Sequence, residues 1–286
     1  MGYLKVALSR DKHFRIYIVE LKDTIEKARL IHNTSPLSTA LLGRVMISTA
    51  LLLSTIKLET DQKVGVDIEC DGPAERVFCE ITGRGRIRGY IANTRLKTVL
   101  RADDGKRKFN VAYAVGGGIF KVIKDVGTGK PYISTSPIVS GEIGQDLAYY
   151  LTSSEQIPSA VSLGVMVEPD GSVSGGAGIL LQTMPHAEDE EIEVMERRFL
   201  DLPPMSSVSK VSMPLEEIIS RIFKDYEIIG ELDIDYFCPC NRETVKQFLL
   251  SLPKRELEDL FDKDRIKVDC KYCGKRYEFK REELGL

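Results

Sequence analysis

The stretch that decides the fold is LSTALLGRVMISTALLLSTI, residues 37–56. Arg44 and several Ser and Thr residues interrupt it, so it differs from the unbroken apolar run typical of a membrane span. Ser35 is placed to cap a helix, and Pro36 suits the first turn, where its missing N–H does no harm. Because apolar residues occur all round this helix, we expect other elements to pack against it on several sides.

Short segments of alternating apolar and polar residues surround the predicted core helix, and such alternation is typical of strands. It predicts strands near residues 4–8, 14–21, 64–70, 77–81, 87–92, 109–115, 120–123, 132–135, 159–167 and 178–182. Helical spacing predicts helices at 23–33 and 143–153. Since the strands arrive mostly as hairpins, we expect an α+β core domain over residues 1–180, with a largely antiparallel sheet around the buried helix.

The pattern changes after residue 180, where two amphipathic helices are predicted. The first carries acids at 188–191 and the basic pair Arg197-Arg198 near its end, which matches the helix dipole. The second has apolar residues at helical spacing from Leu215 to Tyr226. We therefore expect a helical linker over residues 181–230. On the pattern alone an ordinary docked connector is the simpler interpretation, and a detachable cover is the alternative.

Four of the six cysteines lie close to the C-terminus, in DYFCPCNRETV (235–245) and VDCKYCGKRY (268–277). Cys238 and Cys240 form one close pair, and Cys270 and Cys273 form the other. Two such pairs in a cytoplasmic chain are typical of a zinc site rather than a disulfide framework. Four thiolates fill the tetrahedral shell that zinc prefers, which leaves no position for a catalytic water. The sequence therefore predicts a small zinc-binding α+β module over residues 231–286.

The zinc site could be a simple staple or a redox switch, and the first pair favours the switch. In extended backbone Cys238 and Cys240 point the same way and can share a metal, but their Cα separation is near the upper limit for a relaxed disulfide. Strained disulfides are the readily reversible kind. Zinc contributes about 10–16 kcal/mol of folding free energy to small cysteine-rich modules. An oxidant that ejects the metal is therefore expected to unfold this end of the chain.

Composition excludes several other classes of function. A net charge of −3 and a pI of about 5.8 give no overall attraction to nucleic acid or to anionic membranes. The N-terminus lacks the pattern of a secretory signal, so a cytoplasmic location is expected.

DVGTGKP (125–131) has Pro131 where a phosphate loop needs Ser or Thr, and the histidines form no catalytic pattern. We therefore expect a protein that is not an enzyme, and we expect Cys70 and Cys79 to be buried apolar residues.

Taken together, the motifs resemble the heat-shock protein 33 family of redox-regulated chaperones. The resemblance rests on the cysteine spacing and on three stretches: SPLSTALLGRVMISTALLL (35–53), IECDGPAERVFCEITGRGRIRGYIAN (68–93), and SEQIPSAVSLGVMV with GGAGILLQTMP (154–167 and 175–185). It implies a client-binding core domain, a linker and a zinc redox switch that is inactive when reduced. It also implies that oxidants convert Cys238/Cys240 and Cys270/Cys273 into two disulfides, release zinc, destabilise the linker and promote a homodimer. The exposed surface then holds unfolded or partly folded proteins without ATP.

Two other classes of function compete with this interpretation. A zinc-ribbon nucleic-acid binder would use KYCGKRYEFKR (271–281), where basic and aromatic residues alternate. However, residues 231–286 hold thirteen acids against twelve bases, so any basic patch is local. A thiol oxidoreductase is suggested by Cys270-x-x-Cys273, but the pair lacks the strand-to-helix context of thioredoxin-like motifs.

Overall fold

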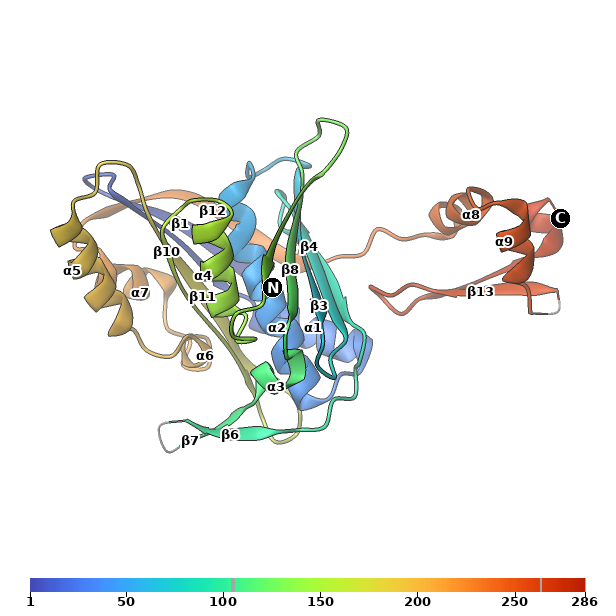
Figure 1. Cartoon of the computed structure of the whole chain (residues 1–286), viewed down its shortest axis with the longest axis horizontal. Coiled ribbons are helices and arrows are strands. Elements are labelled where there is room, and N and C mark those ends of the chain that lie inside the picture. The colour runs from blue at the N-terminus through green and yellow to red at the C-terminus, as the bar shows by residue number, and fades with distance from the viewer. Residues whose placement is uncertain (104–105, 263, 286) are drawn as a thin grey trace. The chain divides into compact units, whose positions relative to one another are not determined.

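A computed structural model describes residues 1–103, 106–262 and 264–285 of the protein (Figure 1). Its contacts divide the chain into two compact units, Met1–Tyr236 and Phe237–Leu286. The functional division predicted at residues 180 and 230 stays a prediction, because compactness does not reveal the role of a segment.

The first unit contains most of the helices and strands. Its strands are β1 (Gly2–Ser9), β2 (Phe14–Glu20), β3 (Lys63–Cys70), β4 (Arg76–Thr82), β5 (Arg86–Ile91), β6 (Leu100–Asp103), β7 (Lys106–Phe109), β8 (Gly118–Asp125), β9 (Tyr132–Pro137), β10 (Ser159–Val167), β11 (Val173–Thr183) and β12 (Tyr226–Tyr236). Its helices are α1 (Lys22–His32), α2 (Pro36–Leu51), η1 (Leu52–Thr55), α3 (Val111–Val115), α4 (Gly144–Ser153), α5 (Asp189–Leu200), α6 (Met205–Val208) and α7 (Leu215–Ile222).

Ten of these strands form one sheet, in the order β10-β11-β2-β1-β12-β5-β4-β3-β8-β9. Within the described residues, neighbouring strands run antiparallel at every junction except that of β12 with β5. That parallel junction consists of the pairs Asp235↔Arg86 and Tyr236↔Ile87. The predicted α+β fold with a largely antiparallel sheet is therefore confirmed.

Helix α2 is the buried core helix that the sequence predicts. It contacts strands from both halves of the sheet, including β2, β10 and β11 on one side and β4 and β5 on the other. Pro36–Thr55 has the length and hydropathy of a membrane-spanning segment, but 89% of its most apolar window is buried inside the fold. Such burial is typical of a core helix. Ser35 does not cap the helix with its side chain; its hydroxyl donates instead to the carbonyl oxygen of Leu96 at 2.8 Å.

Helices α5, α6 and α7, which we call the linker cover, gather against the part of the sheet that contains β2 and β11 (Figure 1). Side chains alternate along β2: Tyr17 and Val19 join the core around α2, whereas Phe14, Ile16 and Ile18 face the cover. The apolar cluster under the cover consists of Ala7, Phe14, Ile16, Ile18, Ala177, Ile179, Leu181, Met205, Val208, Leu215, Ile218, Ile219, Ile222 and Phe223. Both faces of this half of the sheet are thus apolar, and the linker cover keeps water from one of them.

The second unit is small. It contains α8 (Arg242–Leu250), α9 (Lys254–Asp259), β13 (Arg265–Asp269), β14 (Arg276–Lys280) and η2 (Arg281–Leu284). Strands β13 and β14 form an antiparallel hairpin. The buried cluster of this unit consists of Leu249, Leu257, Ile266, Phe279 and Leu284. Helices α8 and α9 lie between the two cysteine pairs in the sequence.

Two predictions of secondary structure were wrong. Residues 109–115 were expected to be a strand, but Val111–Val115 is a helix, capped by the Asn110 side chain, which accepts a hydrogen bond from the Tyr113 amide at 3.0 Å. The last linker helix was expected to reach Tyr226, but it ends at Ile222. Phe223 is extended, and Tyr226 begins β12, because pairing with β1 outweighs local helical spacing.

Candidate metal and redox centre

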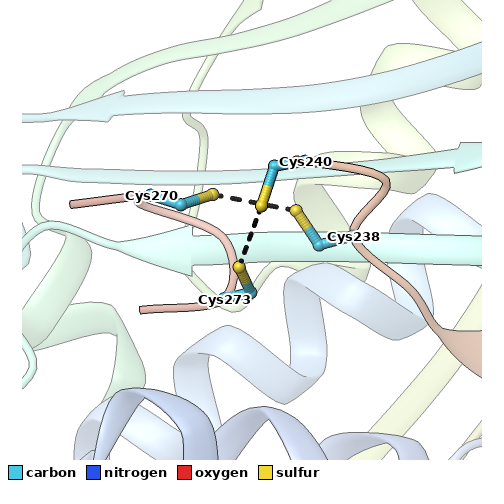
Figure 2. Close-up of side chains that lie close together, drawn as sticks. All are labelled: Cys238, Cys240, Cys270 and Cys273. Atoms are coloured by element: carbon cyan, nitrogen blue, oxygen red, sulfur yellow. Dashed lines mark hydrogen bonds between the residues drawn. The ribbon is translucent and has the colours of Figure 1, made fainter. Parts of the chain in front are cut away.

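The four cysteines of the second unit converge on one point. Their sulfur atoms all lie within 4.8 Å of one another. Two of the contacts join sulfurs from different pairs: Cys238 Sγ lies 3.7 Å from Cys270 Sγ, and Cys240 Sγ lies 3.2 Å from Cys273 Sγ (Figure 2). The structure therefore brings together all four residues that the sequence singled out.

Different local structures position the two pairs. Cys238 and Cys240 lie in an irregular segment between β12 and α8. Cys270 and Cys273 lie in the tight turn between β13 and β14, where the Cys270 amide donates to the carbonyl oxygen of Lys275 at 2.9 Å. Gly274 has a φ of +68°, a conformation that glycine adopts without strain, as the sequence predicts for this turn.

The sulfur geometry fits a tetrahedral metal site. All six cysteines are free thiols, so no disulfide holds the cluster together. A zinc–sulfur bond of about 2.3 Å in a tetrahedron places neighbouring sulfurs about 3.8 Å apart. The 3.7 Å separation of Cys238 and Cys270 is close to that value, and all four sulfurs lie within 4.8 Å of one another. The cluster can hold a metal ion, and zinc is among the metals that bind such a set of sulfur donors.

Tyr277 on β14 contacts the cluster, and sequence analysis did not find it. Its hydroxyl oxygen lies 3.2 Å from Cys240 Sγ and 3.2 Å from the carbonyl oxygen of Cys240. Tyr277 falls three residues after Gly274, but no sequence pattern marks a hydroxyl that will reach a thiol. The hydrogen bond to Cys240 raises the pKa of Tyr277 to about 12, so the hydroxyl stays protonated near neutral pH.

The environment shifts the pKa values of two neighbouring thiols, Cys240 and Cys273, in opposite directions. Burial acts to raise the pKa of Cys240, but hydrogen bonds from Tyr277 and from the other three sulfurs outweigh it and lower that pKa to about 7. Burial raises the pKa of Cys273, and its contact with Cys240 adds to the rise. Without a metal the cluster thus favours a thiolate at Cys240.

Two arginines close to the cysteines in sequence, Arg242 and Arg276, are engaged in ion pairs. Arg276 makes two hydrogen bonds to Asp269, at 2.7 and 2.8 Å, and Arg242 pairs with Glu283 at 2.6 Å. The positive charge available to stabilise thiolates is therefore smaller than a count of basic residues suggests. The same pairing weighs against a nucleic-acid surface, and so does Phe279, which is buried and cannot stack on a base.

The other two cysteines lie in the first unit, on adjacent strands β3 and β4. Cys79 is fully buried, as predicted, whereas Cys70 is only half-buried. Burial raises the pKa of both thiols, that of Cys70 to about 11. Neither is therefore a reactive thiolate at neutral pH.

A second group of possible ligand atoms lies where the linker cover meets the β1–β2 turn. Ligand atoms of Asp11, His13 and Glu191 lie within 4.8 Å of one another. His13 Nδ1 is 2.8 Å from a carboxylate oxygen of Glu191, which also accepts a hydrogen bond from the Glu188 amide. These contacts tie the start of α5 to the sheet, so we interpret the group as a docking contact.

Comparisons with known proteins agree with this geometry. A family profile described as "Hsp33 protein" matches residues 2–280. The chain is 43% identical over 285 residues to a 33 kDa chaperonin from Aquifex aeolicus, a match that covers 99% of this chain and 88% of the relative. It is 40% identical over 278 residues to a 33 kDa chaperonin from Thermotoga maritima, covering 96% and 93%.

A solved structure has the same fold. The crystal structure of the Thermotoga maritima 33 kDa chaperonin, described as a heat shock protein 33 homologue, matches with a TM-score of 0.88 at 38% identity. The match covers 99% of this chain and 96% of that one. The resemblance found in the sequence is confirmed: the chain belongs to the Hsp33 family of chaperones.

Proposed function

We propose that the protein is a redox-regulated chaperone that holds unfolded or partly folded proteins without ATP. In this proposal the reduced, zinc-loaded form is inactive and oxidation activates it. The observation that carries the proposal is the linker cover, which buries an apolar sheet face and is followed in the chain by β12 and then by the thiol cluster. A chemical change at the thiols can thus act on a surface suited to binding apolar segments.

Cys238, Cys240, Cys270 and Cys273 would hold the zinc ion. Zinc supplies a cross-link between four thiolates, and it closes the loop between two cysteine pairs that are separated by 29 intervening residues. Among the described residues of the second unit, five apolar residues are buried and five more are packed against them while partly exposed, which is a small core for a stable fold. The fold of this module therefore depends on the four sulfurs staying together.

The oxidation step needs two equivalents of a peroxide. Within each pair, one thiolate attacks a peroxide oxygen and the O–O bond breaks, which gives a sulfenic acid and releases the first oxygen as hydroxide. The second thiolate then attacks the sulfenic sulfur, and hydroxide leaves as the S–S bond forms. Each pair loses two electrons and gains one S–S bond, and the peroxide leaves as water or hydroxide. We propose the pairs Cys238/Cys240 and Cys270/Cys273. Four thiolates are consumed in this way, so no ligand remains for the metal.

Loss of the module's fold then loosens the linker cover. Helix α7 is joined to Cys238 through β12, so disorder beyond residue 237 removes a restraint on the C-terminal end of β12. Release of the cover would expose Phe14, Ile16 and Ile18 on β2 together with Ile179 and Leu181 on β11. We propose that this face binds client proteins. We also propose that the oxidised protein forms a homodimer and that it acts in the cytoplasm.

The thiol oxidoreductase is less well supported. Cys270 and Cys273 lie in a turn between two strands, not at the N-terminus of a helix, where a thiolate is stabilised for disulfide exchange. Catalytic reduction of insulin disulfides by the reduced protein would revive this alternative.

One experiment tests the proposal. Zinc-loaded, reduced protein is treated with hydrogen peroxide under mild heating, while zinc release, hydrogen exchange of residues 237–285 and suppression of client aggregation are followed together. We expect the three changes to occur in parallel and to reverse with a thiol reductant and zinc. Equal suppression of aggregation by the reduced protein would contradict the switch, although the metal site would stand. Cys70→Ser is the matched control, since this thiol lies outside the cluster.

A further inference from the structure

The hydroxyl of Tyr277 lies against a proposed metal ligand, and its geometry points to a role in the switch. We propose that Tyr277 is a positioning residue of the four-thiol centre, whose hydroxyl holds Cys240 in the cluster and restrains both metal loss and oxidation at that sulfur. This inference rests on the proposed function, because it deepens the account of how the same site is regulated.

The contact is made at two points of one residue. The Tyr277 hydroxyl oxygen lies 3.2 Å from Cys240 Sγ and 3.2 Å from the Cys240 carbonyl oxygen. A phenol has one proton to donate and can turn it to either acceptor without moving its ring. Tyr277 can therefore donate to either the side chain or the backbone of Cys240, and either bond restrains the position of the sulfur.

Tyr277 itself is fixed by regular structure, whereas Cys240 is not. Tyr277 pairs with Val268 in the β13–β14 hairpin, and its ring packs against the buried cluster of the second unit. Next to it, Arg276 bonds both carboxylate oxygens of Asp269, across the same hairpin. Cys240 lies in a segment without helix or strand. The tyrosine is thus the rigid side of the contact.

The hydrogen bond has a direct effect on sulfur chemistry. A hydroxyl that donates to a metal-bound thiolate draws electron density from the sulfur, which makes the sulfur a weaker nucleophile toward peroxide. Hydrogen-bonding partners of metal ligands also orient them, and their loss typically lowers metal affinity by about 10–100-fold. Removal of the hydroxyl should therefore weaken zinc binding and speed the first attack on peroxide.

Tyr277→Phe in the full-length, reduced protein removes the hydroxyl and keeps the ring in the small core. We expect zinc affinity, measured by competition with a chromogenic chelator, to fall by about 10-fold or more. We also expect faster zinc release at a fixed peroxide concentration. With Co²⁺ in place of zinc, the sulfur-to-metal charge-transfer band should shift, because one sulfur has lost a hydrogen bond.

Two control variants separate this role from a structural one. Tyr132→Phe removes an exposed hydroxyl in the first unit and should leave all three measurements unchanged. Asp269→Asn breaks the ion pair with Arg276 beside Tyr277, so it loosens the hairpin without touching a sulfur. It should leave the Co²⁺ band in place. Incorporation of 4-aminophenylalanine at position 277, which restores a donor to the ring, should recover most of the lost affinity.

The inference is overturned if Tyr277→Phe matches the wild type in affinity, release rate and spectrum. It is also overturned if Asp269→Asn shifts the Co²⁺ band as much as Tyr277→Phe, or if the amino analogue fails to rescue a variant that binds zinc weakly. These measurements do not use chaperone activity. If oxidised wild-type protein fails to hold clients, the proposed function falls while the role of Tyr277 is still decided by zinc binding.

Discussion

The two compact units differ in what keeps them folded. The first surrounds α2 with a ten-stranded sheet and buries an extensive apolar core. The second buries five apolar residues and gathers four half-buried sulfurs. Burial scales with size, so the first unit can be stable by itself, whereas a module this small needs a cross-link. Chemistry at sulfur should therefore act strongly on one unit and hardly at all on the other.

The linker cover is intermediate between the two units in how firmly apolar contacts hold it. Helix α7 buries Leu215, Ile218, Ile219 and Ile222, whereas no residue of α5 is fully buried. The cover thus has a well-anchored end at α7 and a weakly anchored end at α5. We expect undocking to begin at α5, because local opening starts where the fewest apolar contacts must be broken.

The largest effect should come from removal of the metal under reducing conditions. A chelator should abolish hydrogen-exchange protection of residues 237–285, because the metal contributes about 10–16 kcal/mol in modules of this kind. The strands around α2 should keep their protection. Cys273→Ser should act like the chelator, and Cys70→Ser should not. A metal-free, reduced protein whose second unit stays protected would remove the proposed difference between the two units.

The next effect concerns which disulfides form. Closure of rings of three and four residues by the proposed pairs is worth roughly 1.6–1.9 kcal/mol each in the loop-entropy model. Crossed pairs, Cys238–Cys270 and Cys240–Cys273, would close loops worth about 3.7 kcal/mol each taken singly and would keep the two ends together. The sulfurs of these crossed pairs lie 3.7 and 3.2 Å apart in the reduced structure.

Peptide mapping of the oxidised protein by mass spectrometry distinguishes the two arrangements. We expect disulfides within each close pair and a tail that is sensitive to protease. Crossed disulfides in a protein that is active as a chaperone would mean that the module need not unfold for activation.

A core substitution under the cover should have a smaller effect. Ile218→Ala on α7 removes a fully buried side chain, which typically destabilises by about 2–5 kcal/mol. The loss falls on the cover, so the reduced protein should bind a hydrophobic dye and suppress aggregation without oxidant. Leu200→Ala on α5 is the control, because Leu200 is 81% exposed and should change little. An Ile218→Ala protein that unfolds as a whole in one transition would show that the cover is not a separable layer.

The sequence predicted the elements whose pattern is local. The core helix, most strands and the four clustered cysteines follow from periodicity, turn residues and spacing. Strand β12 was missed because helical spacing from Leu215 to Tyr226 predicted a helix up to the residue at which the strand begins. Its partners are β1, more than 200 residues away, and β5. Helical spacing up to Tyr226 could not reveal such distant pairing.

The same limit applies to the site. The spacing of the cysteine pairs predicts convergence because a shared metal is the common reason for two such pairs. Tyr277 and the contact of His13 with Glu191 depend on where unrelated segments meet, and no local pattern encodes that. The docking of the linker cover could not be predicted for the same reason. Amphipathic spacing reveals that one face of a helix is buried, but it does not reveal which sheet buries that face.

The smallest predicted effect tests the weak end of the cover. Hydrogen bonds from the Glu188 amide and from His13 hold the pKa of Glu191 below its ordinary value of 4.5. A carboxylate with a lowered pKa in the folded state stabilises that state above 4.5, and the contribution is lost as the pH falls from 4.5 through the lower folded value. Protection of α5 should therefore decline over this acid range.

Glu191→Gln should remove that part of the pH dependence and leave α5 slightly less protected at neutral pH, as hydrogen exchange of residues 189–200 would record. Glu190→Gln is the matched control, because it makes the same charge change in the same first turn without touching His13. If both variants behaved alike, the helix dipole and not the contact with His13 would be the source of the effect. The anchoring of α5 would then rest on its apolar contacts and on Arg198, which donates to the carbonyl oxygen of Ile222 at 2.6 Å.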